Sequence, residues 1–106
     1  MVSLKEACSI IQDALPNNRV IACMETDEYY FFNVPPRRWN GIGPAPAGGS
    51  AEYVSKETGE YNSMQVGEAL EIMLEGDSIN RDTDVLKYLS KEDAIFAQNI
   101  SKKGVT

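Results

Sequence analysis

Between residues 19 and 65 the chain contains four short segments that are rich in β-branched or aromatic side chains. These segments are residues 19–24, 29–34, 51–55 and 60–65. Residues 25–28 connect the first two segments, and residues 56–59 connect the last two. Both connections are charged and four residues long, and connections this short are typical of β-hairpins. The pattern therefore predicts two hairpins whose four strands complete one antiparallel sheet.

A helix is predicted before the first hairpin. Ser3 followed three residues later by Glu6 is a capping box, which marks the start of a helix. The apolar residues that recur at helical spacing after it are Leu4, Ala7, Cys8, Ile11, Ala14 and Leu15. Pro16 cannot continue the helix, so we expect it to cover about residues 3–15.

Helical periodicity returns after the second hairpin. The apolar stripe of the first helical segment consists of Val66, Ala69, Leu70, Met73 and Leu74. We expect this stripe to face the core and Gly76 to end the helix. Residues 82–103 are predicted to be helical again, with Asp82 as a helix cap and a second capping pattern at Ser90. The sequence leaves open whether this region is one helix or two.

The chain length of 106 residues suits one domain, residues 1–106. Strands in hairpins with helices at both ends predict the α+β class. The expected architecture is an N-terminal helix packed on a four-stranded antiparallel sheet made of two hairpins, followed by C-terminal helices.

A loop with four glycines and two prolines spans residues 37–50 and opens with the most distinctive cluster of the chain. Arg37, Arg38 and Trp39 are of the residue types that are enriched at binding hot spots. We therefore predict them as a protein-binding loop. The alternative is that the tryptophan folds back over the open end of the sheet and the arginines are solvated.

Catalytic residues are not evident. The chain has no histidine, which removes Ser-His-Asp and Cys-His catalysis and the commonest zinc ligand sets. Cys8 and Cys23 lie among apolar neighbours and are predicted to be buried, reduced thiols. We expect no catalytic residue and no cofactor.

Two acidic groupings could suggest a cation site. The first grouping is Glu68, Glu71 and Glu75, which we interpret as the solvated face of a helix. The second, Asn80-x-Asp82-x-Asp84, resembles the start of an EF-hand calcium loop. Val85 stands where that loop needs a glycine, and Lys91 stands where it needs the closing glutamate. We therefore expect no metal site.

The net charge of −6 constrains the partner. An acidic surface repels the phosphate backbone of nucleic acid and favours a basic protein partner.

No run of about 18 apolar residues is present, so no membrane span is expected. The N-terminal segment lacks the pattern of a signal peptide, and a cytoplasmic location is expected.

Three stretches together carry a resemblance to known families. LKEACSIIQDALPNNRVIACME, EYYFFNV and EYVSKETGEY cover residues 4–61 with gaps, and their layout resembles PepSY-like domains and certain small bacterial toxin-immunity proteins. The resemblance implies a non-enzymatic inhibitor or partner-binding module, and no functional residue is carried over. The chain departs from it in two ways: PepSY-like domains are usually exported, and the glycine-rich loop and the helices after Val66 are not part of the shared pattern.

The residues and the resemblance together predict a small acidic, non-enzymatic protein-binding module of the bacterial inhibitor or immunity type. The alternative is a homo-oligomeric or phage-type structural protein, for which a homodimer built on an uncovered aromatic strand would suffice.

Overall fold

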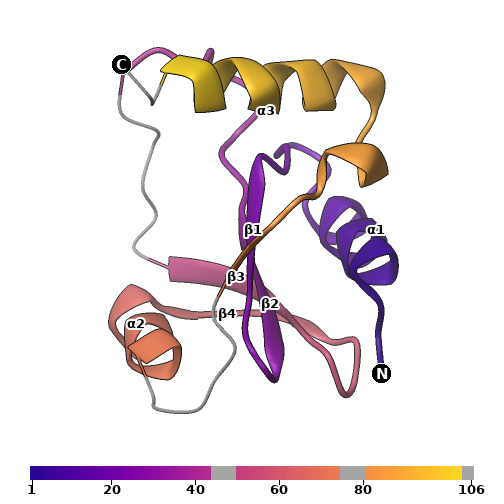
Figure 1. Ribbon diagram of the computed structural model, residues 1–106, viewed down its shortest axis with the longest axis vertical. Helices are drawn as coiled ribbons and strands as arrows, with labels where there is room; N and C mark the ends of the chain where they lie inside the picture. Colours follow the sequence, from indigo (N-terminus) through magenta and orange to yellow (C-terminus); the bar gives the residue numbers. More distant parts are fainter. Residues whose placement is uncertain (44–49, 75–80, 104–106) are drawn as a thin grey trace.

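The first hairpin and the second hairpin lie side by side in one sheet (Figure 1). The computed structural model describes residues 1–43, 50–74 and 81–103. Its elements are α1 (Leu4–Ala14), β1 (Ala22–Glu25), β2 (Tyr29–Asn33), β3 (Ser50–Ser55), β4 (Tyr61–Gln65), α2 (Val66–Leu74), β5 (Arg81–Thr83), the 3-10 helix η1 (Leu86–Tyr88) and α3 (Lys91–Lys103). The predicted α+β class, the N-terminal helix, the two hairpins and the C-terminal helices are confirmed.

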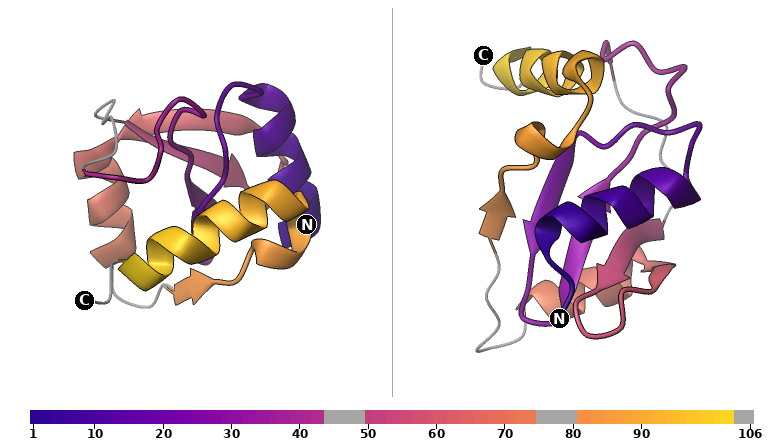
Figure 2. Two further views of the ribbon diagram at one scale, coloured as in Figure 1. Left: turned by 90° about the horizontal axis from the view of Figure 1, so that it is seen from above. Right: turned by 90° about the vertical axis from the view of Figure 1, so that its right-hand side faces the viewer.

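Helix α1 packs on one face of the sheet and forms the core with it. Glu6 N donates to Ser3 Oγ at 3.2 Å, so the predicted cap is confirmed. The side chains of Cys8 and Ile11 are fully buried against Val54 and the rest of the core. Both α1 and α2 flank the sheet, on opposite sides of it (Figure 2).

The aromatic residues of β2 alternate between the two faces, as the period of a strand requires. Tyr30 and Phe32 belong to the core under α1. On the opposite face Tyr29, Phe31 and Tyr53 form a ring cluster, with centroids 5.1 to 5.9 Å apart. Phe31 is buried, whereas Tyr29 and Tyr53 are half-buried, so the outer aromatic residues pack against one another and only Phe31 is fully covered.

A fifth strand extends the sheet beyond the four that were predicted. The strand order is β4-β3-β2-β1-β5, and every neighbouring pair is antiparallel. The prediction of Asp82 as a helix cap is wrong, because it lies in β5 opposite Met24. Pairing with the otherwise open edge of β1 satisfies backbone groups that a capped helix would have left to water.

The region after β5 contains a short 3-10 turn and one α-helix. Leu86 N donates to Asp84 Oδ1 at 3.0 Å at the start of η1. Asp93 N donates to Ser90 Oγ at 3.2 Å, which confirms the predicted cap of α3. Helix α3 crosses the end of the sheet that lies opposite α2 along the long axis (Figure 1). The predicted stop at Gly76 lies outside the described residues.

Candidate interaction surface

Arg37 connects the loop after β2 to α3. Its Nη1 and Nη2 atoms donate to the two carboxylate oxygens of Asp93 at 3.1 and 3.2 Å. Its Nε atom also donates to the carbonyl oxygen of Pro16 at 3.2 Å. Bidentate hydrogen bonding of this kind fixes the planar guanidinium in one orientation. Arg37 therefore ties together the end of the α1 segment, the loop and α3.

Trp39 packs beside this ion pair. Its ring meets the Phe96 ring edge to face at 6.0 Å, and the Arg19 guanidinium lies 4.1 Å from the centre of the same Phe96 ring. Arg19 Nε is 3.9 Å from the buried Asp93 carboxylate. We call Arg19, Arg37, Trp39, Asp93 and Phe96 the α3 anchor. Two of its donors, Arg19 Nε and Trp39 Nε1, are buried without a hydrogen-bond partner among the described residues.

The three predicted binding residues are therefore placed in different environments. Arg37 and Trp39 make the contacts of the α3 anchor, whereas Arg38 is exposed and has no ion pair within the described part of the chain. Ile42 is exposed in the same loop. Gly41, with a φ of +85°, passes close to the Phe96 ring. The anchor thus holds a loop that presents Arg38 and Ile42 to solvent, and the predicted binding role stays a prediction.

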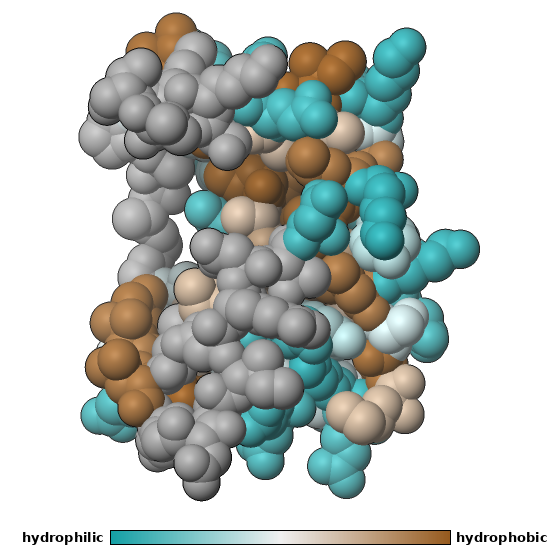
Figure 3. Space-filling model, in the orientation of Figure 1, coloured by the Kyte–Doolittle hydropathy of each residue, from teal (hydrophilic) through white to brown (hydrophobic). Residues whose placement is uncertain are grey.

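The apolar stripe of α2 was expected to face the core, and most of it does not. Ala69 is buried, but Val66, Leu70 and Leu74 are 44%, 51% and 82% exposed. These three residues, which we call the α2 ridge, lie one helical turn apart on one side of α2. Apolar residues gather at the lower left of the space-filling view, where α2 lies (Figure 3).

The exposure of the ridge has a geometric cause. Helix α2 lies against β3 and β4 at one side of the sheet, so a narrow arc of the helix is covered. The apolar arc is wider than that contact. Glu68 and Glu71 are exposed, as predicted for a solvated helix face. Glu75 lies outside the described residues.

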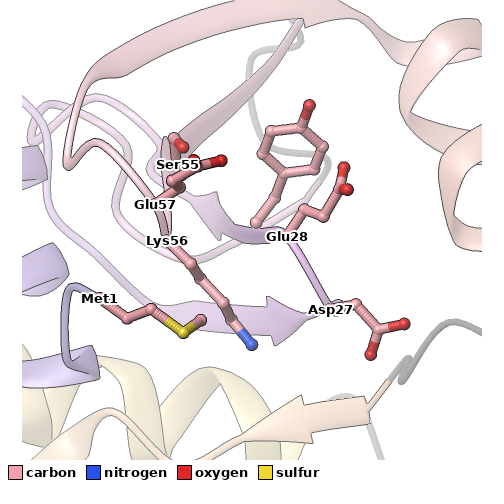
Figure 4. A pocket seen from close by; sticks show the side chains of 7 residues that line it. Met1, Asp27, Glu28, Ser55, Lys56 and Glu57 are labelled. Atoms are coloured by element: carbon pink, nitrogen blue, oxygen red, sulfur yellow. The ribbon is translucent and has the colours of Figure 1, made fainter.

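A pocket of about 420 Å³ lies where the tips of the two hairpins meet. The residues that line it are Met1, Asp27, Glu28, Tyr29, Ser55, Lys56 and Glu57. Lys56 is buried and its Nζ atom is 2.6 Å from Glu25 Oε2. The Glu28 side chain points away from the lysine (Figure 4). The amine is thus held in a structural ion pair with Glu25.

Both thiols are free and buried, as predicted. Burial raises the pKa of the Cys8 thiol to about 11. Burial, together with the nearby Cys8 and Glu25, raises the pKa of the Cys23 thiol to about 12. Both thiols are therefore protonated at neutral pH, and a protonated thiol is a poor nucleophile.

A metal-binding cluster and a membrane-spanning helix are both absent from residues 1–43, 50–74 and 81–103. No group of three or more cysteine or acidic side chains in these ranges is arranged to hold a metal ion. No helix in them combines the length and the apolar character that crossing a membrane requires. Asn80, the first residue of the calcium-loop pattern, lies outside the described residues.

Comparison with known proteins gives no relative from which a function could be transferred. No protein-family model matches the chain, no curated protein matches it, and no solved structure matches it. The resemblance to PepSY-like domains and immunity proteins stays a prediction. The surface of the molecule itself is what bears on function.

Proposed function

We propose that this protein is a small acidic, non-enzymatic module that binds another protein through the α2 ridge. The observation that carries the proposal is the exposure of Val66, Leu70 and Leu74 on consecutive turns of one helix. Single exposed apolar residues are common, but a contiguous exposed stripe marks an interaction site. Apolar side chains at this spacing are the anchors through which a helix meets a partner.

Further features support a binding module over an enzyme. Both thiols are buried with a raised pKa, and the buried Lys56 amine is in an ion pair. We propose Arg38 as a second, separate contact residue, on the loop that Arg37 and Trp39 hold in place. The inhibitor or immunity type follows from the family resemblance of residues 4–61. The two free thiols suit a cytoplasmic location, because cytosolic thiols are kept reduced.

The proposal is tested by cross-linking the intact protein in its native host and identifying the partner. Binding of that partner is then measured for Leu70→Ser and for Ile95→Ser. Ile95 on α3 is a matched control, since it is 49% exposed against 51% for Leu70. Leu70→Ser should weaken binding about tenfold or more, as expected for loss of a central apolar anchor. Equal binding by the two variants would contradict the proposal.

The homo-oligomeric alternative rests on the same ridge, because two copies of α2 could pair. Light scattering at micromolar concentration separates the two functions. We expect a monomer, since the net charge of −6 opposes self-association. A stable dimer that Leu70→Ser converts to a monomer would favour the structural role instead.

A further inference from the structure

We propose that the partner segment received by the α2 ridge is a basic amphipathic helix. This inference rests on the proposed function and specifies the chemistry of the partner. It combines two properties of α2: the apolar stripe and the exposed carboxylate of Glu71 at the edge of that stripe.

The shape of the ridge fits a helix laid alongside α2. The nine residues of α2 span about 13 Å at 1.5 Å per residue, a length that two to three turns of a partner helix cover. Leu70 lies at the centre, with Val66 and Leu74 one turn away on either side. Gly67 is exposed next to them, and nothing lies within 4 Å of the position that a Cβ atom would take there. A partner side chain can therefore approach the helix backbone closely.

The charge beside the ridge selects the partner. Glu71 is exposed three residues before Leu74, which places it at the edge of the ridge, and the sequence of α2 contains no lysine or arginine. Glu68 is also exposed, but it is two residues from both Val66 and Leu70 and so lies on the other side of the helix. A second copy of the chain would place like charges against each other, which disfavours pairing. A partner helix with lysine or arginine beside its apolar stripe would instead bring opposite charges together. Complementary charge around an apolar contact gives specificity and faster association.

The test uses two labelled synthetic helices that share one apolar stripe of leucines. One helix carries lysines beside the stripe and the other carries glutamates. Fluorescence anisotropy with the full chain should show at least about tenfold tighter binding of the lysine helix, equivalent to about 1.4 kcal/mol. Equal affinity for the two helices, or no binding of the lysine helix, would overturn the inference.

Variants locate the contact. Leu70→Ser should weaken binding of the lysine helix about tenfold, whereas the matched Ile95→Ser should leave it unchanged. Glu71→Gln should reduce the preference for the lysine helix and flatten the dependence of affinity on salt. Glu68→Gln, which alters an exposed carboxylate on the other side of α2, is the charge-matched control. If the two variants have equal effects, the preference arises from net charge and the inference fails.

The two proposals fail in distinguishable ways. In the first case, Leu70→Ser loses binding of the native partner, but the protein shows no preference between the two synthetic helices. That result would leave the proposed function intact and overturn the inference that the partner segment is a basic helix. Native partner binding that Leu70→Ser does not change would overturn the proposed function itself.

Discussion

Asp93 is a buried carboxylate shared by two arginines that lie far from it in the sequence. Arg37 binds both of its oxygens and Arg19 lies 3.9 Å away. The sequence shows Asp93 as part of a capping pattern after Ser90, and that local role is confirmed. The ion pair could not be predicted, because it depends on where α3 meets the loop after β2. The same holds for the Trp39 contact with Phe96.

We predict that Asp93→Asn lowers the free energy of unfolding by about 2–4 kcal/mol. Removing one partner of a buried pair leaves the other charge uncompensated, and the Arg19 side chain is almost buried. Urea denaturation followed by circular dichroism measures the change. Asp13→Asn alters an exposed carboxylate of α1 and should stay within about 0.5 kcal/mol. A loss below about 1 kcal/mol for Asp93→Asn would show that the α3 anchor contributes little.

Gly59 is required by the turn between β3 and β4. Its φ is +74°, and a Cβ atom added there would lie 3.0 Å from Val2 Cγ2. Gly59→Ala should therefore cost about 1–2 kcal/mol of unfolding free energy. Gly67→Ala should be neutral or stabilise by up to about 1 kcal/mol, since it has open space in a helix. If thermal unfolding shows similar changes in unfolding free energy for the two variants, this account of the turn is contradicted.

The raised pKa values of the two thiols predict how the free energy of unfolding depends on pH in the alkaline range. Their folded pKa values of about 11 and about 12 exceed the unfolded value of 9.0. Below about pH 9 both states keep these protons, so the thiols add no pH dependence there. Above it the unfolded state loses protons first, and the free energy of unfolding falls as pH rises toward 11. Urea midpoints from pH 8 to 10.5 should fall more steeply for the natural chain than for Cys8→Ala with Cys23→Ala. If the urea midpoints of the two proteins fall equally steeply with pH, the prediction is contradicted.

At the scale of single elements, local signals predicted α1 well, because its cap and its stripe are set within one segment. The short polar strand β5 was not predicted. Its three residues are too few to show a strand periodicity, and its partner β1 lies 56 or more residues away in the sequence. The apolar stripe of α2 was recognised, but its burial was not predicted correctly. Periodicity shows which residues share a helix face, whereas the sheet area available to cover that face depends on the whole fold.

A matched pair of variants tests the capping of α1. Ser3→Ala removes the hydroxyl that accepts from Glu6 N and should cost about 1 kcal/mol of unfolding free energy. Ser9→Ala changes an exposed serine within the same helix and should be neutral or slightly stabilising, because alanine has the higher helix propensity. Both free energies come from urea denaturation. If Ser9→Ala costs as much as Ser3→Ala, the cap has no special role.

At the scale of the whole molecule, helices α1 and α2 lie on opposite sides of the sheet (Figure 2). Hairpin order, helix placement on one face and the α+β class followed from turn signals and periodicity, which are local. The loop after β2, which carries Arg38, and helix α2 lie near opposite ends of the long axis (Figure 1). The candidate binding loop was found from residue types alone. The α2 ridge was missed, because its residues have the pattern of a helix that is buried.

The most direct measurement is a titration of the isotope-labelled protein with the lysine helix, followed by amide chemical shifts in NMR. The account predicts that the shift changes cluster on Val66, Leu70 and Leu74 and on the carboxylate-bearing turns between them, and that the resonances of Ile95 stay in place. Shift changes centred on Arg38 and Ile42, or spread evenly over the protein without reaching α2, would contradict the claim that α2 is the binding surface.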